Sequence, residues 1–243
     1  MIKKAKLIAN SFVVISIFAT IFSACEKTDL QKPNSTVLNQ SLNSDEISFS
    51  KEASNLKLTL RPGPKHGQDV YFDKDQGVES DNLNYVPELC ANSWTINGSL
   101  YRSGFYIRFD SLMLVPSGSH VVSAKLYLYG LSNSLSTPQG DNGDNACYVD
   151  RVISEWDQST LTYLNRPKNS IDHSVTMAAS TSQWNYNAVV DVTSYVSYFV
   201  EKPSENYGFY IHLIDQAQYR SMVFGSSEQS DKNFRPKLVV TYQ

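Results

Sequence analysis

The stretch GFYIRFDSLMLVPSGSHVVSAKLYLYG, residues 104–130, decides the fold class of this chain. It contains two runs in which apolar and more polar side chains alternate, separated by the turn-forming sequence Pro116-Ser117-Gly118. The apolar members are Phe105, Ile107 and Phe109 in the first run, and Ala124, Leu126 and Leu128 in the second. A period of two with one apolar face predicts β-strands that pack on a core from one side.

The same alternation recurs on both sides of this stretch. Its apolar members are Leu56, Leu58 and Leu60 before it, and Phe209, Ile211 and Leu213 after it, and the β-forming run 237–242 closes the chain. A short helix is expected over 193–200, with Asp191 or Thr193 as its cap. Many short strands without long helices predict an all-β fold, a single β-sandwich of jelly-roll type with at most one short helix, over residues 56–243.

The N-terminus has the order of a secretory signal. Basic Lys3, Lys4 and Lys6 precede an uncharged apolar run over 7–22, and Ser23-Ala24-Cys25 follows. This ending resembles the lipobox of bacterial lipoproteins, in which the cysteine is lipidated. We therefore expect a signal peptide over 1–24, a lipid anchor on Cys25 and a bacterial envelope location, at the outer membrane or cell surface. An ordinary signal peptide cleaved near Ala24 is the alternative.

The composition of the chain after residue 24 predicts a linker and gives the charge of the mature protein. Residues 25–55 are rich in Ser, Asn, Gln and charged side chains, which predicts a flexible linker. Without residues 1–24 the chain has 18 Lys and Arg against 24 Asp and Glu, a formal charge of −6. This charge argues against nucleic acid as a partner, and membrane contact is expected only through the lipid. Cys90 and Cys147 remain, and an oxidising compartment leaves a disulfide between them open.

Seven segments in order resemble DNRLRE-type domains. They are LTLRPGPKHGQDVYF at 58–72, the stretch at 104–130, EWDQSTLTYLNRP at 155–167, DVT at 191–193, NYGFYI at 206–211, FGSSE at 224–228 and RPKLVVTY at 235–242. The resemblance implies a jelly-roll sandwich classed with carbohydrate-binding modules. It also implies that members occur beside polysaccharide-degrading enzymes and that some bind acidic polysaccharides such as alginate.

Catalysis is not indicated by any motif in the sequence. There is no GxSxG and no HExxH, and Glu155 and Asp157, which flank Trp156, form no defined acid pair. Trp156 itself is expected in the core. The prediction is a non-catalytic, surface-tethered module that binds polysaccharide. A structural or adhesion module contacting envelope or matrix proteins, and a polysaccharide hydrolase or lyase, are the alternatives.

Glycan binding requires aromatic faces and, for acidic glycans, cations. The aromatic candidates are Trp94, Tyr101, Tyr127 and Tyr129, with Tyr106 and Tyr210 on the outer faces of their strands. The cationic candidates are Arg61, Lys65, His66 and Arg102, followed by Arg108, Arg166, Lys168 and Arg220. Trp94, Tyr101 and Arg102 are expected in a long loop over 76–103. The alternatives are that a loop covers the tyrosine face and that the charges are solvated surface groups.

Two short acidic loops are candidates for a structural calcium ion, the only cofactor considered. The carboxylates are Asp73 and Asp75 in one loop, and Asp141 and Asp144 in the other. Calcium prefers such oxygen ligands, but Asp, Asn and Gly are also common turn residues, and neither loop has the EF-hand pattern.

Overall fold

The computed structural model describes residues 46–75, 82–131, 144–173, 175–183 and 186–243. They belong to one folded unit, Ser41–Gln243. Among these residues no helix has the length and apolar character needed to cross a membrane. The predicted signal peptide and Cys25 lie outside the described part, so the anchor stays a prediction.

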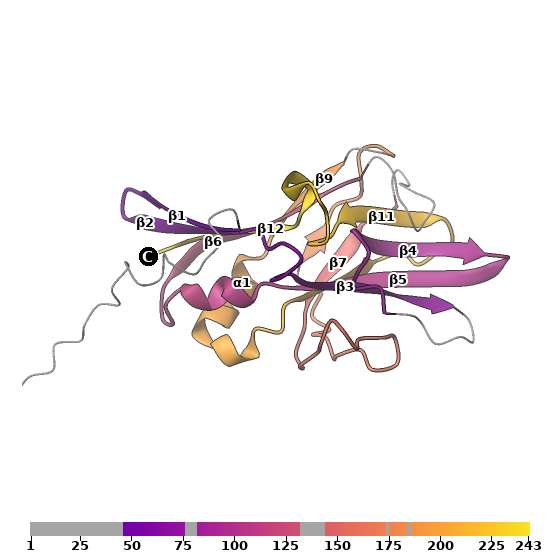
Figure 1. Ribbon diagram of the computed structural model, residues 1–243, viewed down its shortest axis with the longest axis horizontal. Helices are drawn as coiled ribbons and strands as arrows, with labels where there is room; N and C mark the ends of the chain where they lie inside the picture. The colour runs from indigo at the N-terminus through magenta and orange to yellow at the C-terminus, as the bar shows by residue number, and fades with distance from the viewer. Residues whose placement is uncertain (1–45, 76–81, 132–143, 174, 184–185) are drawn as a thin grey trace, which may run out of the picture. The chain divides into compact units, whose positions relative to one another are not determined.

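The folded unit consists of two antiparallel sheets (Figure 1). Sheet A has the order β1 (Ile47–Glu52), β2 (Asn55–Leu60), β12 (Lys237–Tyr242), β6 (Val121–Tyr129) and β9 (Asn187–Asp191). Sheet B has the order β11 (Arg220–Gly225), β4 (Glu88–Ile96), β5 (Ser99–Arg108), β10 (Phe209–Leu213), β7 (Cys147–Arg151) and β8 (Thr176–Met177), and β3 (Gln68–Asp75) pairs with β5. The 3-10 turns are η2 (Asp110–Leu114), η3 (Pro203–Glu205) and η4 (Lys232–Phe234). The predicted all-β sandwich is confirmed.

The main core lies between the inner faces of the two sheets and matches the alternation in the sequence. Its buried members include Leu58, Leu60, Leu126, Leu128, Leu238 and Val240 from sheet A, and Phe105, Ile107, Val149, Phe209 and Ile211 from sheet B. Helix α1 (Thr193–Glu201) buries Val196, Phe199 and Val200 against the same core. The helix lies where it was predicted, but its N-cap is Val192 and not Asp191 or Thr193. The Asp191 carboxylate accepts a hydrogen bond from the Thr193 backbone N–H at 3.0 Å, at the start of the helix.

A second cluster covers part of the outer face of sheet B. Val70, Phe72, Tyr106, Val152 and Leu161 are its buried members, and four further aromatic residues pack against it, namely Trp156, Tyr163, Tyr207 and Tyr210. The chain between β7 and β8 supplies Val152, Trp156, Leu161 and Tyr163. The chain between β7 and β8 therefore covers the tyrosine face of sheet B, which is one of the alternatives that the sequence left open. Trp156, expected in the core, is half-buried at the edge of this cluster and donates its indole N–H to the Tyr207 carbonyl at 2.7 Å.

Two boundaries differ from the sequence prediction. The linker was expected to reach residue 55, but β1 occupies Ile47–Glu52 and pairs with β2. The long loop expected over 76–103 is largely a hairpin of β4 and β5, turning at Asn97 (φ 52°) and Gly98 (φ 82°). Asn-Gly with two positive φ angles is the preferred two-residue hairpin turn, because Gly has no Cβ and Asn tolerates this region.

Cys90 and Cys147 are fully buried in the main core, and no disulfide joins them. The Cys147 thiol lies 3.5 Å from the Asn145 carbonyl, and burial raises its pKa. Both cysteines thus act as small apolar side chains, and the disulfide that the sequence left open is not formed.

Candidate functional site

A groove of about 770 Å³ lies over the outer face of sheet B. Its floor comes from β5, β7 and β10, including Gly104, Asp150, Tyr210 and His212, and one wall comes from the chain between β7 and β8. We call this cavity the sheet-B groove. It is larger than the cavity of about 350 Å³ at the connection between β2 and β3.

The groove opens where β5 changes its partner. Residues 99–103 of β5 pair with β4, whereas residues 105–107 pair with β10, so the change falls at Gly104. A Cβ on Gly104 would lie 2.6 Å from the Tyr210 hydroxyl oxygen. Glycine at this position lets the Tyr210 ring lie down on the sheet and form the groove floor.

A ladder of aromatic rings continues along this floor. The centroids of Tyr106 and Tyr210 lie 4.5 Å apart, and those of Tyr210 and His212 lie 4.8 Å apart. Tyr148 continues the ladder to His173, at 4.2 Å with the ring planes 22° apart. Burial raises the pKa of the Tyr210 hydroxyl, so it stays neutral and can both donate and accept a hydrogen bond.

Several polar atoms at the groove are buried without a hydrogen-bond partner within the described chain. They are Nδ2 of Asn92, Nε of Arg102 and Oδ1 of Asn169. Buried polar groups without partners are rare in native proteins, because each loses its hydration without compensation.

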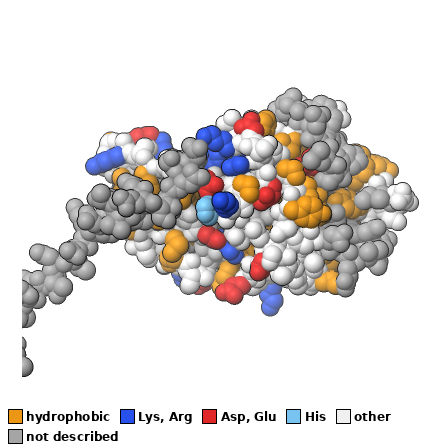
Figure 2. Space-filling model, in the orientation of Figure 1, with side chains coloured by type: hydrophobic (Ala, Val, Ile, Leu, Met, Phe, Trp, Pro, Cys, Tyr) orange, Lys and Arg blue, Asp and Glu red, His pale blue; other side chains and the backbone are white. Residues whose placement is uncertain are grey.

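The groove also concentrates positive charge. Arg102, Arg166 and Lys168 line it, and the Arg166 guanidinium carbon lies 3.8 Å from the Tyr163 ring centroid. On the face seen in Figure 2, acidic and basic side chains are interspersed near the middle. An anionic ligand would therefore be attracted by this local cluster rather than by a broad surface field.

The groove also contains one cluster of possible metal ligands, Asp150, His173 and His212. The two carboxylate oxygens of Asp150 lie 2.8 Å from His173 Nδ1 and 2.9 Å from His212 Nε2. Sequence reasoning missed this cluster because its members come from three separate segments. A usable signal existed, since Asp150 and His212 occupy the outward positions of their strands.

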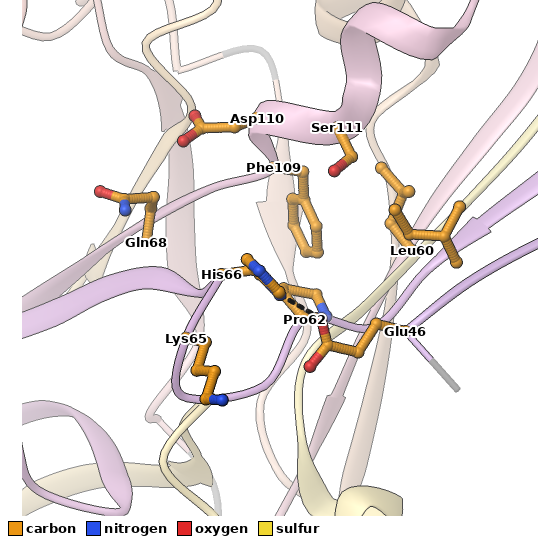
Figure 3. Close-up of a pocket in the computed structure, with 10 residues that line it drawn as sticks. Glu46, Leu60, Pro62, Lys65, His66, Gln68, Phe109, Asp110 and Ser111 are labelled. Carbon is orange, nitrogen blue, oxygen red and sulfur yellow. Dashed lines mark hydrogen bonds and ion pairs between the residues drawn. The ribbon is translucent and has the colours of Figure 1, made fainter. Parts of the chain in front are cut away.

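Lys65 and His66 lie in a different cavity of about 350 Å³, at the connection between β2 and β3 (Figure 3). His66 Nδ1 lies 2.7 Å from the Glu46 carboxylate, and the Phe109 ring lies between this pair and Ser111 (Figure 3). Because Glu46 and Asp110 offset the positive charges, this cavity is less suited to an anionic ligand than the sheet-B groove.

The aromatic candidates from the sequence fall in two other places. Trp94 and Tyr101 are paired across the β4–β5 hairpin, where Tyr101 is buried and Trp94 packs edge-on against Tyr219 at 5.1 Å. Tyr127 and Tyr129 lie on sheet A, with the Lys237 ammonium 4.1 Å and 5.9 Å from their ring centroids.

The cationic candidates are likewise divided between the two sheets. The Arg61 guanidinium lies 5.6 Å from the Tyr129 ring centroid, on sheet A. Of the glycan-binding candidates from the sequence, four line the sheet-B groove, namely Arg102, Arg166, Lys168 and Tyr210.

The calcium candidates do not form a site among the described residues. Asp144 has a positive φ of 47° and its carboxylate lies 3.6 Å from the Arg220 guanidinium. Asp141 lies outside the described residues, as do the side chains of Asp73 and Asp75 at the end of β3. The calcium site therefore stays a prediction.

A β-sandwich with a ring-floored, polar groove on one sheet has the architecture of a carbohydrate-binding module. The chain belongs to carbohydrate-binding module family 96, whose family model matches residues 79–242. A search of curated proteins finds no match. The predicted relationship to carbohydrate-binding modules is confirmed, and the narrower DNRLRE assignment stays a prediction.

Proposed function

We propose that this chain is a non-catalytic, lipid-anchored surface module that binds acidic polysaccharide in the sheet-B groove. The observation that carries the proposal is that Arg102 lines the groove together with two further cations, Arg166 and Lys168. A guanidinium recognises a carboxylate with a planar pair of donors. Tyr210 and His212 line the groove and offer aromatic contacts to a sugar ring.

The carboxylates near the groove support a binding role rather than hydrolysis. Glu155 and Asp157 lie with Trp156 in a separate, open depression. The Ser159 hydroxyl and backbone N–H both donate to Asp157 and lower its pKa, which disfavours the protonated form that a general acid needs. Both carboxylate oxygens of Asp150 already contact histidine nitrogens, one from His173 and one from His212.

Binding is tested by affinity electrophoresis of the purified chain in gels that contain one polysaccharide each. The panel pairs acidic glycans, alginate and polygalacturonate, with neutral glucans and xylans, and each gel is run with and without a chelator. We expect retardation by an acidic glycan that weakens as salt rises, since charge pairing is screened. No retardation by any glycan, together with recovery of envelope proteins in a pull-down, would favour the adhesion alternative. Shortening of the glycan by the chain would instead favour the hydrolase or lyase.

The anchor is tested by mass spectrometry of the mature N-terminus in a bacterial host that lipidates its envelope proteins. We expect a chain that begins at a lipidated Cys25 and fractionates with membranes. Cys25→Ser should move the chain to the soluble fraction while leaving glycan binding intact. An unmodified N-terminus near Ala24 would refute the anchor without affecting the groove.

A further inference from the structure

Three side chains at the sheet-B groove bring one carboxylate and two imidazole nitrogens together. Asp150 comes from β7, His212 from β10, and His173 from the chain that leads to β8. Their ligand atoms all lie within 4.8 Å of one another. Tyr210 pairs with Asp150 and His212 with Tyr148 in the β10–β7 register, which places the Asp150 and His212 side chains diagonally on the same outer face.

The carboxylate of this cluster is buried while the cluster stays accessible from the groove. The Asp150 side chain is 3% exposed, against 17% for His212 and 38% for His173. Within the described residues, the ion-pair partners of Asp150 are these two histidines. A buried carboxylate is stabilised by compensating positive charge. A divalent cation would supply the charge.

His173 is held in an unusual backbone conformation at this point. Its φ is 45°, a region that few non-glycine residues adopt. Backbone hydrogen bonds fix the chain on both sides, from Ser170 N–H to the Arg151 carbonyl at 2.8 Å and from Val149 N–H to the Val175 carbonyl at 2.9 Å. The His173 ring stacks on Tyr148, which holds the imidazole in place. The surrounding structure thus maintains a conformation that directs His173 to Asp150.

The donor set indicates the class of ion. Two imidazole nitrogens and one carboxylate oxygen suit zinc and neighbouring transition ions, whereas calcium and magnesium prefer oxygen ligands throughout. Around a tetrahedral zinc ion the ligand atoms stand about 3.3 Å apart. To reach this spacing, the contacts of 2.8 Å and 2.9 Å to Asp150 would lengthen slightly, and ligand atoms that now lie up to 4.8 Å apart would move closer by side-chain rotation.

We propose that Asp150, His173 and His212 form a binding site for a divalent transition-metal ion of the zinc type. The proposal does not depend on which glycan the groove binds. On metal binding, the imidazole nitrogen that faces Asp150 becomes the ligand in each histidine, and the one proton of the neutral ring sits on its other nitrogen.

The test is calorimetric titration of zinc chloride into the untagged full-length chain in detergent. We expect one zinc ion per chain at this site. His173→Asn is the most direct variant, because Asn tolerates positive φ and removes the imidazole from a partly exposed side chain. His212→Gln removes the second nitrogen. Each variant should bind zinc at least about 100-fold more weakly than the wild type. Replacing a residue that only hydrogen-bonds to a metal ligand already lowers metal affinity by about 10–100-fold, and these variants remove a ligand itself.

His120→Ala is the matched control, because this exposed histidine lies outside the groove. It should bind zinc as the wild type does. Circular dichroism without metal should show the same fold for His173→Asn and the wild type. Wild-type affinity in both His173→Asn and His212→Gln, or a wild-type chain that takes up no zinc, would overturn the proposal.

Discussion

Arg102→Gln is expected to weaken binding of the acidic polysaccharide by about 10- to 100-fold, because a hydrogen bond to a charged group contributes about 1.5–3 kcal/mol. The Arg102 Nε is buried at the groove and has no hydrogen-bond partner among the described residues. Gln at this position keeps the β-hairpin pairing to Ser93, so the loss would reflect the missing guanidinium. Isothermal titration with an oligosaccharide of the retarding polysaccharide measures the change.

Arg61→Gln is the control for this experiment. Arg61 is an equally plausible ligand from the sequence, but its guanidinium lies beside Tyr129 on sheet A and donates to the Lys232 carbonyl at 3.2 Å. We expect its affinity to equal that of the wild type. If Arg61→Gln weakened glycan binding and Arg102→Gln did not, the binding site would have to be assigned to sheet A.

The free energy of unfolding is expected to fall by up to about 4 kcal/mol as the pH rises from 4 to 7, because of Asp69. Burial raises the pKa of this carboxyl from 3.8 to about 7, against the opposing effect of hydrogen bonds from Ser227. The folded state therefore binds a proton that the unfolded state has already lost within this range. The contribution of Asp69 to the free energy of unfolding is greatest below pH 4. It declines between pH 4 and pH 7 and is constant above pH 7.

Urea denaturation at pH 5.0 and 7.5 measures this effect, with Asp69→Asn as the comparison. Asn keeps an oxygen that can accept the Ser227 N–H, now at 2.8 Å from Asp69, but it cannot ionise. The variant should therefore show a smaller fall in stability between the two pH values. Asp191, whose pKa is lowered to about 2 by Lys125 and Thr193, acts at more acidic pH and leaves this comparison undisturbed. An equal fall in both proteins would contradict the assignment to Asp69.

The strands with strict alternation could be predicted from the sequence because each has one face on the main core. Phe105 and Ile107 in β5 and Leu126 and Leu128 in β6 are buried as expected. The hairpin of β4 and β5 was missed, although Asn97-Gly98 is a strong turn signal, because the segment before it has mixed polarity. The strand β1 was missed because all but its first residue are exposed, so its composition resembles a linker.

The groove could be predicted only in fragments. Its members come from β4, β5, β7, β10 and the chain between β7 and β8, and no fixed spacing connects them. Arg102 was a candidate through its charge, whereas its neighbours Trp94 and Tyr101 face away into packing contacts. Successive side chains of a strand point to opposite faces of the sheet, so Arg102 faces the groove and Tyr101 faces the other side.

With the lipid anchor and the glycan site that we propose, the position of β1 at the edge of sheet A would have a mechanical consequence. Tension between a lipid at Cys25 and a glycan in the groove would enter the folded unit at Glu46 and act first on β1. This strand pairs only with β2, while β2 is also held by β12. Peeling β1 away would release residues 46–54 and add roughly 30 Å of extended chain. The groove lies on sheet B, so the module could lengthen under tension while the glycan stays bound.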